Sequence, residues 1–209
     1  VGYDRAWGDV DVRLANLSLV EGRYDDAAAR VRLEVDTVDN VALPSRGTYA
    51  LVDLRRADEA FGADLAYTRS DALLQHTLPL GRFVVSPQAR WTATWSGDLP
   101  LVRMPALGGF LNLTGLPRNS DPANNLAVGA LAARYRLNTS ALLLDIPLWL
   151  GGSYEAGATA DRRGDVLDRL RQGGSAFVAA DTPLGAVLVG GGLAESEGMT
   201  LFLFVGRAL

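Results

Sequence analysis

Apolar and charged residues alternate one by one in residues 29–36, which read ARVRLEVD. Successive side chains of a β-strand point to opposite faces, so this pattern predicts a strand with one charged face and one aliphatic face. The same two-residue period is clear in residues 82–96 and 126–137. We therefore expect an all-β protein of about ten antiparallel strands.

The other strands follow from the same period and from the turn residues between them. The expected strands are residues 3–16, 29–36, 48–55, 63–78, 82–96, 126–137, 149–160, 174–181, 185–195 and 199–207. Residues 17–26 contain Glu-Gly and Asp-Asp pairs and predict a loop, and residues 166–170 have the spacing of a short helix.

Alternation alone fits either a soluble β-sandwich or a transmembrane up-and-down β-barrel. Strands of about 10 residues match a tilted strand that spans a bilayer. The predicted connections alternate between short and long, as in outer-membrane barrels. Lysine is absent, and arginine recurs in mid-strand on the face opposite the aliphatic one. These features favour a barrel in the outer membrane of a Gram-negative bacterium, and the soluble sandwich binding module stays as an alternative.

The charged strand face predicts a polar lumen in which arginines and carboxylates pair with one another. We favour such structural pairing over a metal or acid-base site. The residues assigned to this lumen charge network are Arg30, Arg32, Glu34, Arg69, Asp71, Arg90, Arg134, Arg136 and Glu155. A second group of aromatic residues is expected to form an interfacial belt or to face lipid, and it consists of Trp91, Trp95, Trp149, Phe202 and Phe204.

Composition narrows the classes of function. The formal net charge of −4 argues against a nucleic-acid partner held by phosphate contacts. The chain has no cysteine and a single histidine, His76, which excludes a cysteine or multi-histidine zinc site. No apolar run reaches the length of a transmembrane helix. We expect no metal and no cofactor.

The connection from residue 97 to residue 125 is long for a compact domain, and such loops are usually functional. Residues 103–115 within it read RMPALGGFLNLTG. We expect this loop to fold back into the barrel lumen, with its tip at residues 108–115. The tip residues that we assign to the lumen are Gly108, Gly109, Phe110, Leu113, Thr114 and Gly115.

Four motifs occur in order: DTVDNVALPSRG at residues 36–47, LGGFLNLTG at 107–115, LGGSYEAG at 150–157 and DTPLG at 181–185. Together they resemble the C-terminal barrel of patatin-like phospholipase autotransporters, within the superfamily of outer-membrane assembly and secretion barrels. The resemblance covers nearly the whole chain, so residues 1–209 are expected to be the C-terminal portion of one barrel domain.

The resemblance implies a barrel of about sixteen strands, preceded by a periplasmic POTRA domain and a patatin-like lipase. This segment would then anchor and translocate that N-terminal passenger. Its implied partners are the lipid bilayer, the outer-membrane assembly machinery, and either the missing N-terminal strands, POTRA and passenger or a second copy of the chain.

The loop tip departs from the superfamily pattern. Thr114 stands where the superfamily commonly has an arginine, which reaches an acidic residue on the strand that carries the Glu155 motif. Without that charge, we expect Glu155 to pair with Arg134 or Arg136 on the preceding strand. Packing of Phe110 and Leu113, together with backbone hydrogen bonds, would then hold a looser loop inside.

Catalysis by this segment is not expected. A patatin lipase needs a Gly-x-Ser-x-Gly nucleophile elbow, and the chain has none. Ser153 lies in GGSYE, without the second glycine. An outer-membrane lipolytic enzyme that uses His76 is the alternative, although a polar residue at the membrane interface is the simpler interpretation of His76.

Overall fold

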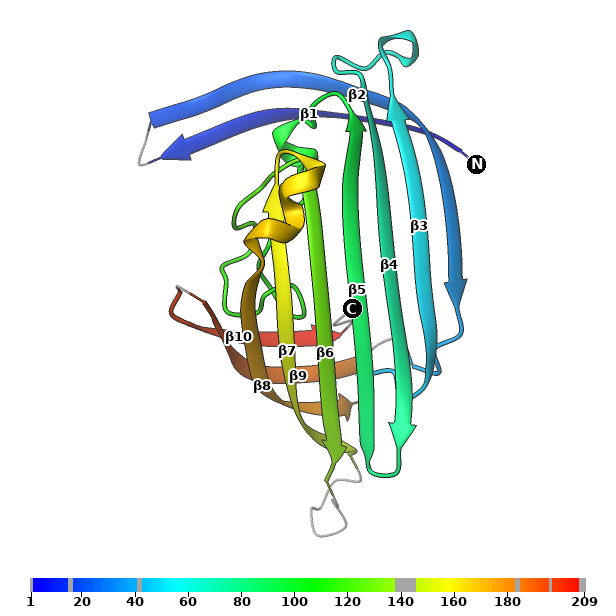
Figure 1. The fold of residues 1–209 in the computed structure, drawn as a ribbon, viewed down its shortest axis with the longest axis vertical. Helices are drawn as coiled ribbons and strands as arrows, with labels where there is room; N and C mark the ends of the chain where they lie inside the picture. The colour runs from blue at the N-terminus through cyan, green and yellow to red at the C-terminus, as the bar shows by residue number, and fades with distance from the viewer. Residues whose placement is uncertain are drawn as a thin grey trace.

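The computed structural model describes residues 2–14, 17–40, 43–137, 146–182, 185–195 and 197–206, with side chains from residue 25 onward. Ten strands form one sheet in chain order, and every pair of neighbours is antiparallel (Figure 1). The strands are β1 Gly2–Leu14, β2 Leu17–Asp36, β3 Gly47–Ala57, β4 Tyr67–Leu80, β5 Phe83–Ser96, β6 Asn125–Arg136, β7 Leu148–Ala160, β8 Arg171–Thr182, β9 Gly185–Ala194 and β10 Met199–Gly206.

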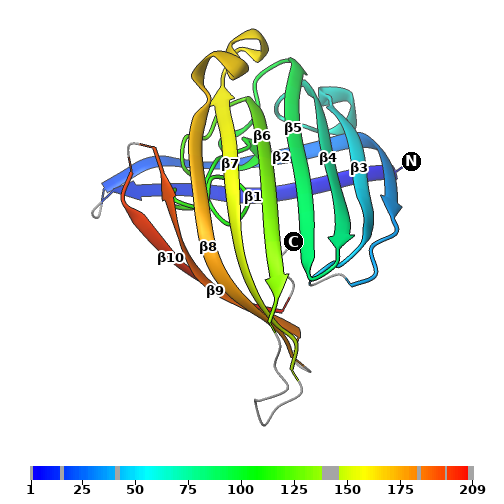
Figure 2. The same cartoon turned by 60° about the horizontal axis from the view of Figure 1, so that its bottom comes forward.

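The predicted fold class is confirmed, because the chain is an all-β, antiparallel up-and-down sheet that curves as a barrel does (Figures 1 and 2). The soluble sandwich is not the architecture, since a sandwich needs two packed sheets and all ten strands belong to one. In the described part of the chain, β1 pairs only with β2 and β10 pairs only with β9. The sheet therefore has two open edges.

The loop expected at residues 17–26 is wrong. These residues form the first half of β2, which is 20 residues long. β1 pairs with them from Leu14↔Leu17 to Gly2↔Arg30, so their backbone groups find partners in a hairpin. The short helix that was expected near residues 166–170 is present as the 3-10 helix η3, Arg163–Arg169. Two shorter 3-10 helices are η1, Glu59–Phe61, and η2, Leu101–Arg103.

The expected alternation of short and long connections holds only in part. At one end, β4 and β5 are joined through Gly81 and Arg82, whereas β6 and β7 are 11 residues apart. At the other end, residues 97–124 join β5 to β6, but β9 and β10 are separated by only four residues, 195–198. Connection length alone therefore does not distinguish one end of the sheet from the other.

The two faces of the sheet differ in chemistry. Along β10, Leu201, Leu203 and Val205 are 73%, 63% and 64% exposed, while Phe202 and Phe204 between them point into the interior. The same outward aliphatic character recurs across the sheet, for example at Leu33, Val52, Leu74, Leu131, Leu150, Val178 and Val189. Inward positions are polar in β3 to β5, with Asp53, Gln75 and Thr92 buried. No helix among the described residues is long and apolar enough to cross a membrane.

Candidate functional site

The connection between β5 and β6, residues 97–124, turns back along the inner side of the curved sheet (Figure 2). Its side chains pack into several clusters in the interior. Leu107, Leu113 and Leu116 are buried with residues of β6 and β9, and Leu111 packs on Ala130 and Ala132 of β6. The loop thus contributes its own core, which links strands on different sides of the sheet.

The tip of this loop has an unusual backbone. Gly108 has a φ of 102°, and a Cβ at this position would lie 1.8 Å from the carbonyl oxygen of Pro117. Leu111 and Leu113 also have positive φ, at 57° and 63°, a conformation that is costly for residues with a side chain. Such strain persists only where surrounding contacts determine it, and Leu113 is completely buried. Packing of the tip therefore outweighs its backbone preference.

The carboxyl group of Glu155 on β7 anchors the tip. Glu155 is 0% exposed. The Thr114 N–H donates to its Oε2 at 2.7 Å, and the Thr114 hydroxyl donates to its Oε1 at 2.5 Å. The Ser153 hydroxyl adds a third hydrogen bond, at 2.5 Å. Because a buried carboxyl group without donors is strongly unfavourable, these bonds tie the position of the loop to β7.

The loop tip also contacts the backbone of β9 directly. A Cβ added at Gly115 would lie 2.0 Å from the backbone nitrogen of Ala194. A Cβ added at Gly192 would lie 2.9 Å from the Thr114 Cβ. The hydroxyl of Thr200 on β10 donates to the Gly115 carbonyl oxygen at 2.8 Å. Glycines at these positions let the loop and the sheet approach more closely than side chains would permit.

The predicted partners of Glu155 are therefore wrong. Thr114 keeps the contact between the loop and β7 by means of its backbone and hydroxyl rather than a charge. Glu155 pairs across the sheet with Ala130, and Arg134 lies four positions further along β6, opposite Gly151. Arg134 donates to the Pro44 carbonyl oxygen, and its guanidinium lies 5.5 Å from the centre of the Trp149 ring. Arg136 lies 5.9 Å from the same ring.

Residues 37–40 and 43–46, between β2 and β3, also enter the interior, where the sequence predicted only a turn. Leu43 is buried in a cluster with Phe177, Ala179, Ala186 and Leu188. The Asn40 side chain donates to Asp181 at the end of β8, 3.2 Å away. The DTVDNVALPSRG and DTPLG motifs thus meet in space. The unusual composition of the two motifs was the only sign in the sequence of a special position. Their contact could not be predicted from it, because the two residues are 141 positions apart.

Three of the aromatic residues expected to form a belt or to face lipid lie inside instead. Phe202 and Phe204 are 5.3 Å and 5.8 Å from the ring centre of Phe110. Phe110 also meets Phe177 edge-on at 5.2 Å. Trp149 packs against the same cluster. The reason is the phase of the alternation, since Leu201, Leu203 and Val205 occupy the outward positions of β10. Trp95 does face outward and is 58% exposed.

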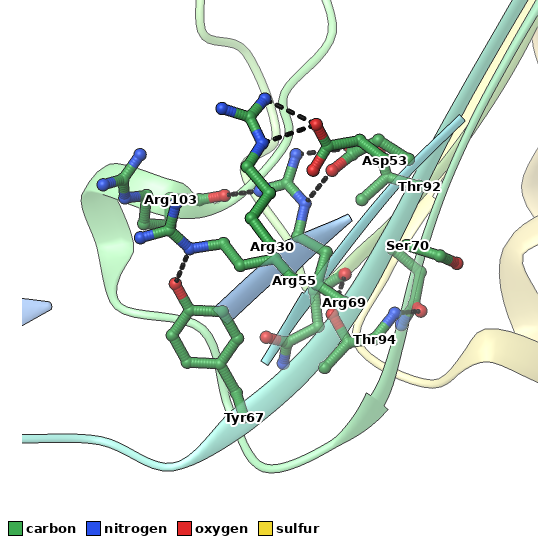
Figure 3. Close-up of polar contacts among 12 residues, drawn as sticks. Arg30, Asp53, Arg55, Tyr67, Arg69, Ser70, Thr92, Thr94 and Arg103 are labelled. Atoms are coloured by element: carbon green, nitrogen blue, oxygen red, sulfur yellow. Dashed lines mark hydrogen bonds and ion pairs between the residues drawn. The ribbon is translucent and has the colours of Figure 1, made fainter. Parts of the chain in front are cut away.

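The inner faces of β2 to β5 carry the charged residues of the network, which line a cavity of about 760 Å³ (Figure 3). Three ion pairs involve predicted members. They are Arg30 with Asp53 at 2.5 Å, Arg69 with Asp71 at 2.6 Å and Arg32 with Glu34 at 3.1 Å. Arg90 lines the same cavity. Arg134, Arg136 and Glu155 have the separate contacts described above.

Asp26 is the buried centre of this network, and the sequence did not predict it. Its carboxylate is 2.9 Å from Arg55 and 2.8 Å from Arg103, and it accepts a hydrogen bond from the Tyr67 hydroxyl at 3.0 Å. Arg103 belongs to the long loop, and its carbonyl oxygen accepts from Arg69. The network therefore holds the first part of the loop against β2 and β4. Asp26 was missed because its segment was expected to be a loop.

The residues of the lipolytic alternative lie apart. His76 is exposed on the outer face of β4, and its Nδ1 is 2.7 Å from the Thr48 hydroxyl. The hydroxyl of Ser153 points inward and bonds to Glu155 and, at 2.7 Å, to Ser175. A serine and a histidine on opposite faces of one sheet cannot form a nucleophile and base pair. The described residues contain no group of three or more His, Asp or Glu residues placed to hold a metal ion.

Comparison with known proteins finds the same fold among solved structures. No family model and no curated protein matches the sequence. A crystal structure of BamA from Haemophilus ducreyi that lacks POTRA domains 1–3 superposes with a TM-score of 0.69 at 12% sequence identity. The two chains share a fold. The match covers 94% of this chain and 44% of the BamA chain, so this chain spans less than half of the length of that structure.

We predict that Thr114→Val lowers the free energy of unfolding by about 1.5–3 kcal/mol, the usual value of a hydrogen bond to a charged group. Valine keeps the shape of threonine but removes the hydroxyl that donates to Glu155. The measurement is denaturant unfolding of the refolded chain, followed by tryptophan fluorescence. Thr159→Val is the control, because that hydroxyl is exposed and donates to the Asp121 carbonyl oxygen. Equal losses for the two variants would contradict an anchoring role of Thr114.

A second prediction concerns Asp39, which lies outside the strands. Partial burial raises the pKa of its carboxyl group, but hydrogen bonds from the Ser45 hydroxyl and from the N–H groups of Ser45 and Arg46 outweigh it, and the net pKa lies below 3.8. A carboxyl group with a lowered pKa stabilises the folded state at pH values above its unfolded-state pKa. This contribution is lost as the pH falls through the folded-state pKa.

Asp39→Asn should therefore lower the free energy of unfolding by about 1 kcal/mol at pH 7, and its difference from the wild type should shrink below about pH 4. Unfolding curves between these pH values provide the test. Asp168→Asn, on the exposed η3, should change the free energy of unfolding by less than about 0.5 kcal/mol. A difference for Asp39→Asn that is constant with pH would show that the charge of Asp39 has no role.

Proposed function

We propose that this chain is the C-terminal portion of an outer-membrane β-barrel that anchors and translocates an N-terminal patatin-like phospholipase in a Gram-negative bacterium. On this proposal the segment itself is not an enzyme, and the lipid bilayer surrounds its strands. The observation that carries the proposal is the distribution of side chains between the two faces of the sheet.

Aliphatic side chains cover the outward face, and ion pairs lie within the curve of the sheet. Leu33, Leu201 and Leu203 are more than 60% exposed, whereas Asp26 is 2% exposed between two arginines. A soluble protein rarely exposes an apolar surface of this extent. A strand in a bilayer needs this arrangement, because lipid surrounds its outer face while its inner face lines a polar lumen.

The long loop supports a translocator of the assembly and secretion type. Its tip docks on Glu155 of the LGGSYEAG motif through the LGGFLNLTG motif, which are two of the motifs that carry the family resemblance. The BamA structure with the same fold belongs to a protein that has POTRA domains. The family resemblance likewise implies a POTRA domain before this barrel.

The two open edges of the sheet are where further strands could pair. β1 and β10 each have a pairing partner on one side only in the described part of the chain. Unpaired backbone groups cannot remain in lipid, so a complete barrel must pair both edges. We propose that preceding strands of the full protein, giving about sixteen in all, pair with β1 and β10; a second copy of the chain is the alternative.

The membrane assignment predicts that Leu131→Arg, in the middle of the outward face of β6, lowers the free energy of unfolding in lipid vesicles by about 2–4 kcal/mol. Leu167→Arg is the matched control. Leu167 is 58% exposed, more than Leu131 at 49%, but it lies on η3 beyond the strands. Equal effects of the two arginines, or a purified chain that stays monodisperse without detergent, would refute the membrane assignment.

The passenger assignment is tested by the coding sequence upstream of this segment. The proposal predicts a patatin domain with a Gly-x-Ser-x-Gly elbow, followed by a POTRA domain and further strands with the same alternation. An upstream sequence that lacks a lipase would remove the passenger from the proposal, and the barrel assignment would then depend on the vesicle measurement alone.

A further inference from the structure

A second, smaller cavity of about 430 Å³ lies between the long loop and strands β4 and β5. Four arginines line it, and no aspartate or glutamate does. β4 and β5 supply Arg69 and Arg90, and the loop supplies Arg103 and Arg118. The cavity adjoins the larger one, since Arg69, Arg90 and Arg103 line both. The acidic residues that line the larger cavity, such as Asp53, are absent from the smaller one.

Two of these four cations form ion pairs among the described residues. Arg69 forms an ion pair with Asp71, and Arg103 forms one with Asp26. Arg90 and Arg118 make no ion pair with any residue that the structure describes. The guanidinium of Arg118 lies instead over the ring of Phe204, 5.5 Å from its centre. Asp71 also interacts electrostatically with Arg90, so two carboxylates, Asp26 and Asp71, lie close to four guanidinium groups. The excess of positive charge in a partly enclosed space attracts anions from solution.

Two residues of the cavity wall, Arg69 and Asn112, are held in place before any ligand arrives. Arg69 donates to both carboxylate oxygens of Asp71 and to the Arg103 carbonyl oxygen, which joins the strand to the loop. Asn112 on the cavity wall is fixed by hydrogen bonds to the carbonyl oxygens of Ala106 and Gly108. A guanidinium group that is fixed in the way of Arg69 loses little conformational entropy when it binds a ligand, whereas Asn112 only shapes the wall, because its N–H groups already donate to backbone carbonyls.

We propose that this cavity binds an oxyanion of the phosphate or sulfate class, with Arg90 and Arg118 as its principal ligands. Guanidinium groups present planar pairs of N–H donors that match the oxygens of such anions. Two of the four arginines come from the loop, so the site exists only when the loop is docked. The anion is either free in solution or the phosphate of a lipid headgroup.

The experiment measures the thermal unfolding midpoint of the refolded chain in uncharged detergent as inorganic phosphate replaces chloride at constant ionic strength. A ligand that binds the folded state raises the midpoint in proportion to its occupancy. Phosphate should give a saturable rise, and Arg90→Gln or Arg118→Gln should increase its Kd at least ~10-fold, as expected for the loss of a charged hydrogen bond.

Arg82→Gln is the matched control, because Arg82 lies in the turn between β4 and β5 at the opposite end of the strands from the loop. It should leave the Kd for phosphate unchanged. Arg118 is exposed, so Arg118→Gln provides a folded variant even if Arg90→Gln fails to fold. Neither variant changes the outward face of the sheet, so the result is independent of the membrane assignment.

A second set of micelles contains phosphatidylglycerol in place of inorganic phosphate. A saturable rise with phosphate identifies a soluble anion, and a rise only with phosphatidylglycerol identifies a lipid headgroup; either result supports the site if Arg118→Gln removes it. The proposal is overturned if neither probe gives a saturable rise, or if the wild type and Arg118→Gln respond equally.

Discussion

The buried carboxyl group of Glu155 requires hydrogen-bond donors, and two of its three donors come from Thr114 at the tip of the long loop. This requirement couples a strand to a segment 41 positions away in the sequence. Because the tip cannot leave without exposing or orphaning Glu155, the loop remains inside. The position of the tip then explains three other features. They are the left-handed backbone conformation of Leu111 and Leu113, the close glycine contacts on β9 and the interior phenylalanine cluster.

Two polar systems hold the same loop at two separate points. Asp26 binds Arg103 at its beginning, and Glu155 binds Thr114 near its middle. Between them the loop supplies Phe110 and Leu113 to the apolar interior. Residues 43–46 enter from the other end of the strands and meet the same cluster through Leu43. The interior is therefore filled from both ends, and the inward side chains of a strongly curved sheet gain packing partners that neighbouring strands alone cannot provide.

Local periodicity predicts most of this fold, because alternation in a strand is a property of consecutive residues. Ten strands and the charged inner face of β2 to β5 could be predicted in this way. Residues 17–26 could not, since pairing with β1 overrides their turn-like composition. The inward position of Phe202 and Phe204 depends on which phase of β10 faces the interior. A pattern of apolar residues at every position does not determine that phase.

The candidate site was predictable only in outline. The length and glycines of the loop indicated a segment with a special position, but its partners are distant in sequence. Replacement of an expected arginine by Thr114 suggested a lost contact with Glu155, whereas a backbone N–H and a hydroxyl preserve it. Side-chain identity alone does not show where a backbone donor points, so such substitutions are easily misinterpreted.

Docking of the loop tip can be measured directly, because the chain contains no cysteine of its own. In Thr114→Cys combined with Gly192→Cys the two β-carbons start 2.9 Å apart, closer than the roughly 3.5–4.5 Å of a disulfide, so the docked tip forms the bond after moving outward by about 1 Å. Gly191, the preceding residue of β9, faces outward, where a Cβ would meet Leu201. Quantification of the cross-link after refolding and mild oxidation should show a disulfide for the pair 114 and 192 and none for 114 and 191. No cross-link in the first pair, or equal yields in both, would contradict a loop that is held inside the barrel by Glu155.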